Sequence, residues 1–262
     1  MDLYSPVEMA ERVEAGGVAK AALDAPRTIA LAILAGAFIG LGGLFSTVVS
    51  TDTGLGFGAT RLLAGLSFSL GLILVIVGGA ELFTGNALLV IAWADKRVTT
   101  SRVLRNWLLV YAGNFAGAVA MAVGVWLAGV GRLDGGKVGQ TAVAIATAKA
   151  SLSAGDAFFR GVLCNALVCL AVWLTFSART TADKILAIVF PITAFVAIGL
   201  EHSIANMYFI PLGMLLQDAT GTITWSGFLL GNLLPVTLGN IAGGSLMVGL
   251  AYWFIYLRGK RG

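Results

Sequence analysis

The chain has 262 residues, of which 58% are hydrophobic and only 11% are charged, and its formal net charge is +4. Soluble domains carry about a quarter charged residues, so this composition excludes an ordinary soluble enzyme and indicates a membrane protein. The Lys and Arg residues lie in segments between apolar runs, without interleaved aromatic residues. We therefore expect no nucleic-acid partner.

The first segment, residues 1–27, is more charged than the sequence that follows. Its stretch LYSPVEMAERVEAGGVAKAAL has Pro6 near a helix start and apolar residues at mixed spacings of three and four. This pattern predicts an amphipathic helix, and no signal peptide is visible. We expect this segment to lie in the cytoplasm.

Long uncharged runs follow, and a helix needs roughly 20 apolar residues to cross a bilayer. The runs predict six membrane spans, near residues 28–50, 62–93, 106–130, 157–178, 185–216 and 229–257. The transmembrane domain then covers residues 28–257, with a short tail at 258–262. Most of the 17 Lys and Arg residues lie on one side of these spans, so we expect both termini in the cytoplasm.

The second and fifth predicted spans are too long for straight helices. Each would reach about 48 Å at the helical rise, against a hydrocarbon core of about 30 Å. Each also contains a polar interruption, GGAELFTGN at 78–86 and IGLEHSIAN at 198–206. Glycine and small polar residues let the backbone leave the helix where it lines a cavity, so we predict a break in both spans.

The two halves of the chain repeat each other weakly. ELFTGN and EHSIAN share Glu-x-x-x-x-Asn, and NWLLVYAGNFAG (106–117) matches NLLPVTLGNIAG (232–243) at Gly-Asn-x-x-Gly and at other positions. Each half holds three spans, and an odd number forces opposite orientations. An all-α inverted repeat is predicted, an arrangement that builds transporters and channels with a site near the midplane.

Charged residues inside the predicted breaks are the candidates for chemistry. A carboxylate at the bilayer centre costs roughly 2.5–3.5 kcal/mol, so it needs a partner or a task. For Glu81 we expect backbone N–H partners, and for Glu201 we expect Lys149, from the apolar stretch TAVAIATAKASLSAG. His202, the single histidine, can donate to an anion or exchange a proton with it, and Thr84 offers a hydroxyl from the matching break.

The remaining polar residues of the spans have structural interpretations. We expect Asn86 and Asn206 to bind backbone groups freed by the breaks, and Asn114 and Asn240 to make interhelical hydrogen bonds. The sequence has no metal-ligand spacing and no phosphate-binding loop. We therefore expect neither a cofactor nor an enzyme.

Four strings carry a resemblance to a known family. VGGAELFTGN (77–86), GVLCNALVCLAVW (161–173), GLEHSIANM (199–207) and LPVTLGNIAGG (234–244) resemble the formate/nitrite transporter family. The likeness covers nearly the whole chain and is strongest to the bacterial formate channels, through NMYFIPLGM, GNLLPVTLGNIAGG and YWFIYLR. ELFTGN is as similar to the nitrite branch of the family as it is to the formate branch.

The resemblance implies an aquaporin-like six-helix fold in the bacterial inner membrane, assembled as a homopentamer with one pore in each protomer. By position it makes His202 the central pore histidine, faced by Thr84, and makes Lys149 and Glu201 a vestibule pair. The resemblance also implies that Asn165 and Asn206 are polar residues that support the site. Phe68 and Phe195 match one hydrophobic narrowing of the pore, and Leu82 and Phe83 match a second. Leu72 lines the path between them.

These features predict a channel or proton-coupled transporter for small monovalent anions. Formate is the expected substrate, and nitrite or hydrosulfide are alternatives within the same family. A neutral-solute pore is a further alternative, although the lysine, glutamate and histidine argue against it. Apart from the substrate and a second copy of the chain, we expect only membrane lipids as partners.

Overall fold

The computed structural model describes residues 3–259, and six helices in that part of the chain are long and apolar enough to cross a membrane. Five of these spans are α2 (Ala25–Ser50), α3 (Phe57–Gly78), α5 (Thr100–Leu127), α7 (Ala154–Thr175) and α8 (Thr181–Ile198). The sixth, Gly227–Tyr256, joins η4 (Gly227–Leu233), α10 (Leu234–Ala242), η5 (Gly243–Leu250) and α11 (Ala251–Tyr256). The six predicted spans are confirmed. Residues 1–2 and 260–262 of the predicted terminal segments lie outside the described residues.

Both predicted breaks are present. Helix α3 stops at Gly78, and the chain becomes helical again as η1 (Gly85–Leu88) and α4 (Leu89–Ala94). Helix α8 stops at Ile198 and is followed by α9 (Ser203–Leu216). Gly79 and Gly199, directly after the two stops, have φ of +80° and +84°. Glycine adopts this left-handed conformation without strain, which ends each half-helix cleanly.

Several spans begin a few residues before their apolar runs. Asp24, Thr99, Ser153 and Thr180 are the N-caps of α2, α5, α7 and α8, and each side chain accepts a backbone N–H of the first turn. Polar caps satisfy the free N–H groups at a helix start. The charge-free runs alone therefore place these helix starts too late.

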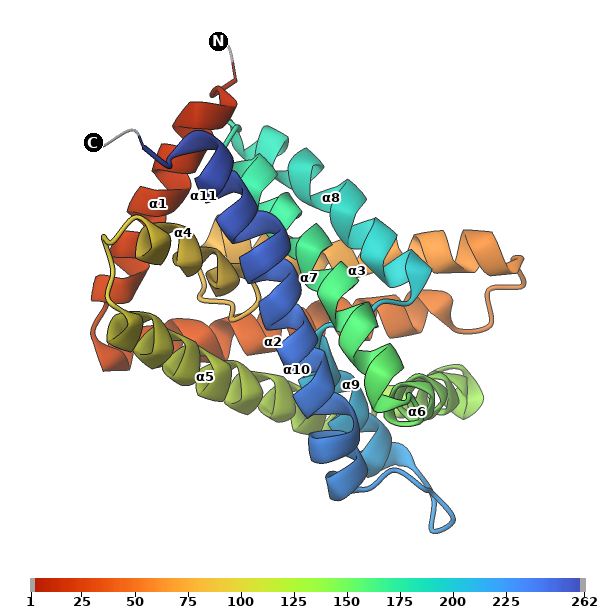
Figure 1. Ribbon diagram of the computed structural model, residues 1–262. Coiled ribbons are helices and arrows are strands. Elements are labelled where there is room, and N and C mark those ends of the chain that lie inside the picture. Colours follow the sequence, from red (N-terminus) through yellow and green to blue (C-terminus); the bar gives the residue numbers. More distant parts are fainter. Residues whose placement is uncertain (1–2, 260–262) are drawn as a thin grey trace.

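Two further helices lie at opposite ends of the molecule. Figure 1 shows α1 (Pro6–Ala22), α4 and both chain ends at one end, and α6 (Lys137–Ala150) at the other. Helix α1 starts with a capping box, in which the Ser5 hydroxyl and backbone N–H bind Glu8 and lower the pKa of its carboxyl. The short turns η2 (Val130–Arg132) and η3 (Asp134–Gly136) lead into α6, which packs against α9.

The spans pack in matching pairs. Helix α2 packs against α5 and α3, and α7 packs in the same way against α10 and α8. A Cβ atom at Gly117 of α5 would collide with the Ile33 carbonyl of α2, and one at Gly243 would collide with the Val162 carbonyl of α7. Small residues allow this close approach of membrane helices. The matched crossings confirm the inverted repeat.

Candidate pore and its two cavities

Lys149 and Glu201 form the ion pair expected from the sequence. The Lys149 Nζ atom lies 2.9 Å from Glu201 Oε1, and the two side chains are 16% and 4% exposed. Lys149 reaches this position from the last turn of α6, and Glu201 lies in the break between α8 and α9. Pairing offsets part of the cost of burying the carboxylate, while the ammonium lines an open cavity.

Glu81 has a charged partner, which contradicts the expectation of backbone N–H groups. Lys20 Nζ of α1 donates to Glu81 Oε1 at 2.6 Å, and Asn86 Nδ2 donates to Oε2 at 2.7 Å. The lysine comes from a segment that was expected to lie outside the membrane domain. It reaches the break because α1 packs against α4 and η1.

The two amides at the breaks also differ from the expectation. Asn86 and Asn206 bind carboxylates and other amides rather than freed backbone groups. Asn206 Nδ2 donates to Glu201 Oε2 at 2.6 Å and to Asn232 Oδ1 at 2.7 Å. Asn86 Nδ2 makes the same bonds to Glu81 and to Asn106 Oδ1. Each glutamate thus accepts hydrogen bonds from a lysine and an amide.

The repeat therefore includes α1 and α6 as well as the spans. Lys20 stands in AKAAL and Lys149 in AKASL, so the two pentapeptides differ at one position. Each lysine pairs with the glutamate of the break in its own half. This match was present in the sequence and could have identified Lys20 as the missing partner of Glu81.

Asn114 and Asn240 fix the backbone of the two breaks, as expected of interhelical hydrogen bonds. Asn114 Nδ2 donates to the carbonyls of Ala32 and Glu81 at 2.7 and 2.9 Å, and its Oδ1 accepts from the Phe83 N–H. Asn240 repeats this pattern with the carbonyls of Gly161 and Glu201 and with the Ser203 N–H. Both side chains are fully buried.

His202 and Thr84 join the two breaks at the centre of the molecule. His202 Nδ1 accepts the Ala205 N–H at 3.1 Å and so caps α9. Because Nδ1 is an acceptor, the neutral ring carries its proton on Nε2, which lies 2.9 Å from Thr84 Oγ1. Both residues are buried. The backbone cap therefore selects the tautomer that can donate a hydrogen bond.

Asn165 of α7 supports this central contact by binding the backbone of the first break. Its Nδ2 donates to the Thr84 carbonyl at 3.1 Å and to the Asn240 carbonyl at 2.7 Å. It thus ties the break that carries Thr84 to the last span. The amide fixes the backbone of Thr84 rather than its hydroxyl.

A cavity of about 610 Å³, which we call the Lys149 cavity, opens on one side of this centre. Phe68, Phe195 and His202 are among its lining residues, together with Lys149 and Glu201. The rings of Phe68 and Phe195 meet edge to face with their centroids 5.5 Å apart. The structure thus brings the predicted phenylalanine pair next to the ion pair and the histidine.

A second cavity of about 350 Å³, the Lys20 cavity, opens on the other side. Lys20, Glu81, Leu72 and Leu82 are among its lining residues. Of the pair predicted at this narrowing, Leu82 lines the cavity. The ring of Phe83 instead packs against Tyr111 and Trp107 of α5, at centroid distances of 4.8 and 6.1 Å.

The linings of the two cavities include residues one helical turn apart. Along α3, Phe68 lines the Lys149 cavity and Leu72, one turn later, lines the Lys20 cavity. One helical turn rises about 5.4 Å. Both side chains are 2% exposed. Two buried apolar side chains, neighbours on one face of α3, therefore belong to different cavities.

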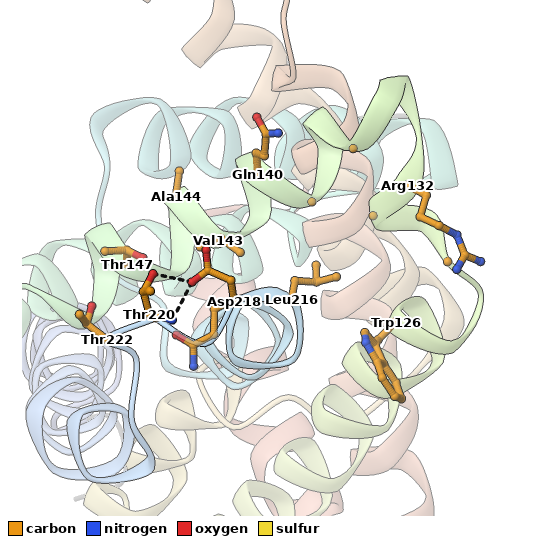
Figure 2. Close-up of a pocket in the computed structure, with 16 residues that line it drawn as sticks. Trp126, Arg132, Gln140, Val143, Ala144, Thr147, Leu216, Asp218, Thr220 and Thr222 are labelled. Carbon is orange, nitrogen blue, oxygen red and sulfur yellow. Dashed lines mark hydrogen bonds between the residues drawn. The ribbon is translucent and has the colours of Figure 1, made fainter.

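A third cavity, of about 680 Å³, lies apart from the two cavities at the breaks. Figure 2 shows it between α6 and the segment after α9, with Gln140, Thr147 and Asp218 among its lining residues. The Asp218 carboxylate accepts bonds from the Thr220 N–H and hydroxyl, so it is satisfied locally. None of the predicted site residues lines this cavity.

Comparison with known proteins connects this arrangement to a family. The family model described as formate/nitrite transporter matches residues 7–254. The chain belongs to the formate/nitrite transporter family. Among family members, "Formate channel FocA" of Escherichia coli strain K12 is 42% identical, over 98% of this chain and 96% of that protein. The "Probable formate transporter" of Methanothermobacter thermautotrophicus is 41% identical, over 97% of both chains.

Solved structures of this transporter family have the same fold. A "Pentameric formate channel with formate bound" is 39% identical with a TM-score of 0.80, over 89% of this chain and 98% of that one. An "FNT family ion channel" is 31% identical with a TM-score of 0.86, over 94% and 98%. The resemblance first seen in four short strings of sequence is confirmed, and the chain is a multi-pass membrane protein.

Proposed function

We propose that the protein is a formate channel in which each protomer has its own pore along the two cavities. The observation that carries this proposal is a lysine–glutamate pair in each of two cavities whose linings include residues one turn apart on α3. Relatives named as formate channels cover nearly the whole chain and support formate as the substrate.

The two cavity linings hold more cationic side chains than carboxylates, and this excess of positive charge draws a small anion into the cavities. Lys149 and Lys20 each place an ammonium at a cavity wall, and Arg61 and Lys184 add further positive charge to the two linings. A cleft with low-dielectric walls focuses this field and raises the local concentration of anions. A neutral solute gains nothing from these charges.

The apolar side chains between the two cavities then determine whether the substrate crosses as an anion or as the neutral acid. A bare anion loses its hydration between Phe68, Phe195, Leu72 and Leu82, which is expensive. Crossing as the neutral acid removes most of that cost. Alternatively, His202 Nε2–H replaces water as the hydrogen-bond donor to the anion. In both cases Asn165 and Asn206 serve the pore by holding the backbone and the carboxylate around it.

The assembly and orientation belong to the same proposal. A related channel is described as pentameric, and we infer a homopentamer for this chain. Arg97, Arg102, Arg105 and Arg258 lie on the side of the chain ends, and cationic loops face the cytoplasm. We infer a bacterial cytoplasmic membrane with both termini inside.

Flux measurements in proteoliposomes test the proposal. Purified protein is reconstituted, and uptake of formate, nitrite and hydrosulfide is followed at two external pH values. Formate uptake that is fastest of the three and rises at acid pH is the expected result. Faster nitrite or hydrosulfide uptake would assign the same pore to another substrate. Glycerol-driven swelling without anion uptake, or no uptake of any solute, contradicts the proposal.

A further inference from the structure

Two arginines bind the turn that ends α8. Arg61 of α3 donates from Nε to the Ala197 carbonyl at 2.9 Å and from Nη2 to the Val196 carbonyl. Arg160 of α7 donates from Nη1 to the Gly199 carbonyl at 3.4 Å. A Cβ atom on Gly199 would lie 3.1 Å from Arg61 Nη2. The two guanidiniums therefore lie next to the same glycine, at the start of the second break.

Neither arginine is required by the internal repeat. Leu31 occupies the position that corresponds to Arg160, because the carbonyl of each residue accepts the N–H of the glutamate in one of the breaks. The alignment of ELFTGN with EHSIAN places Thr181 at the position that corresponds to Arg61. Neither corresponding residue is charged. The two guanidiniums at the end of α8 are therefore an addition to the repeated framework.

The same arginines supply the net charge of the Lys149 cavity. Its lining holds three cationic side chains, Arg61, Lys149 and Arg160, and one carboxylate, that of Glu201. Lys149 pairs with this carboxylate at 2.9 Å. Neither arginine forms an ion pair with a carboxylate among the residues that the structure describes. An anion that enters the cavity therefore meets two positive charges that no carboxylate balances.

Both guanidiniums also retain N–H groups that can bind a ligand. A guanidinium has five N–H donors in a planar fork. Arg61 uses two of them on carbonyls, and Arg160 uses one. The other N–H groups have no protein partner within the described part of the chain. The partial negative charge at the C-terminus of α8 is only about half a unit, so each arginine keeps most of its attraction for an anion.

We propose that Arg61 and Arg160 form an anion-binding site on the wall of the Lys149 cavity. Its ligand is a small monovalent oxyanion, the class to which formate belongs, because N–H groups of a guanidinium bind the oxygens of such an anion in pairs. The site takes the anion from water and holds it in the cavity before it reaches the apolar side chains. This inference rests on the proposed formate channel and names the residues that recruit its substrate.

The first experiment measures initial rates of formate influx into proteoliposomes against formate concentration, at low and high ionic strength. Arg160→Gln removes a charge but keeps the bond from the Glu201 N–H to the backbone carbonyl at position 160. Arg61→Gln removes the other charge, and Arg61→Lys keeps the charge but removes the fork. The control is Arg132→Gln, because Arg132 lines the third cavity and not the Lys149 cavity. Gel filtration checks the assembly of each variant.

Loss of either charge should weaken binding of formate more than it changes the maximal rate. We expect Arg160→Gln and Arg61→Gln each to raise the half-saturation concentration for formate about two- to fivefold, the range of a partly exposed ion pair. This difference from wild type should shrink at high ionic strength, where charges are screened. Arg61→Lys should lie between Arg61→Gln and wild type. Arg132→Gln should behave as wild type.

The second experiment measures binding without flux and uses the wild-type protein. Phenylglyoxal modifies guanidiniums, and mass spectrometry of the digested channel reports the modification of each arginine separately. Arg160 and Arg132 are both exposed, so their rates of modification can be compared in one sample. We expect formate to slow the modification of Arg160 severalfold and to leave Arg132 unchanged. The same concentration of formamide, which is neutral, should protect neither residue.

Three results would overturn the inference. One is a wild-type half-saturation concentration in assembled Arg160→Gln and Arg61→Gln channels. Another is a rise that is equally large at high ionic strength, which would indicate a structural effect instead of anion binding. The third is an Arg160 that formate protects no better than Arg132. Wild-type protein without formate flux but with a protected Arg160 would instead refute the proposed function and leave the anion site in place. If Arg61→Gln does not assemble, Arg160→Gln and the protection of wild-type protein still decide the question.

Discussion

Replacing Lys149 with methionine should weaken the attraction of the Lys149 cavity for anions. The Lys149–Glu201 pair is neutral as a whole, so Lys149→Met leaves one uncompensated negative charge at the cavity wall. Asn206 still donates to that carboxylate at 2.6 Å. Two unit charges about 7 Å apart interact by roughly 2–3 kcal/mol at an effective dielectric constant of about 20. The expected loss of anion occupancy is roughly 30- to 150-fold.

The double variant separates this charge effect from loss of the lysine itself. Adding Glu201→Gln to Lys149→Met restores neutrality and keeps an oxygen for Asn206. We expect formate influx in the double variant to recover most of the loss, and Glu201→Gln alone to bind formate more tightly than wild type. The assay is the initial rate of influx against formate concentration, repeated at high ionic strength, where screening should shrink the differences.

A matched lysine provides the control. Lys137 lies on the same helix and pairs with Asp52, but both side chains are about half exposed. Exposed pairs contribute little, so Lys137→Met should leave influx unchanged. The electrostatic reasoning is wrong if the double variant is no faster than Lys149→Met, or if the half-saturation concentration of the single variant matches wild type.

Three further outcomes follow from the same geometry. Asn114→Leu and Asn240→Leu should each lower the free energy of unfolding by about 2–4 kcal/mol, since each leaves one carbonyl and one N–H of a break without their amide partner. Denaturant titration in detergent measures this. Lys20→Met should slow formate influx, and adding Glu81→Gln should restore it. A double variant as slow as Lys20→Met would contradict a charge effect. His202→Asn should lower formate flux, because the substitution removes the Nε2–H donor. The pH profile should stay the same, because Nδ1 of His202 is occupied by the cap of α9. A flattened profile in the same flux assay would identify His202 as the proton donor.

The spans, the breaks and one ion pair could be predicted because the bilayer makes the alternatives, a span that is too long or a buried charge without a partner, energetically unfavourable. A run too long for the hydrocarbon core must tilt or break, and the glycines at 79 and 199 mark where it does. A buried carboxylate needs a partner, and Lys149 was the one cation in an apolar stretch near Glu201. These inferences depend on local sequence alone.

The partner of Glu81 could not be found in that way. Lys20 stands in a segment whose charge suggested the cytoplasm, and nothing local indicates that α1 packs against the break. The near-identity of AKAAL and AKASL carried the information, but only after Lys149 had been paired. Phe209, which lines the Lys149 cavity and stacks on Phe68, was missed for another reason. A phenylalanine among apolar residues is compatible with lipid, core or cavity until the packing of its helix is known.

The two halves of the chain match closely at the lysine–glutamate pairs but differ at the centre. Lys20 and Lys149 match, as do Glu81 and Glu201, so the two entrances present the same charges. At the centre, Leu82 occupies the position equivalent to His202. The imidazole is thus supplied by one half and the Thr84 hydroxyl that contacts it by the other, while the lysine–glutamate pair is present in both halves. A pore with matched entrances and one short barrier has no built-in direction, so net flow through it follows the gradients of substrate and proton.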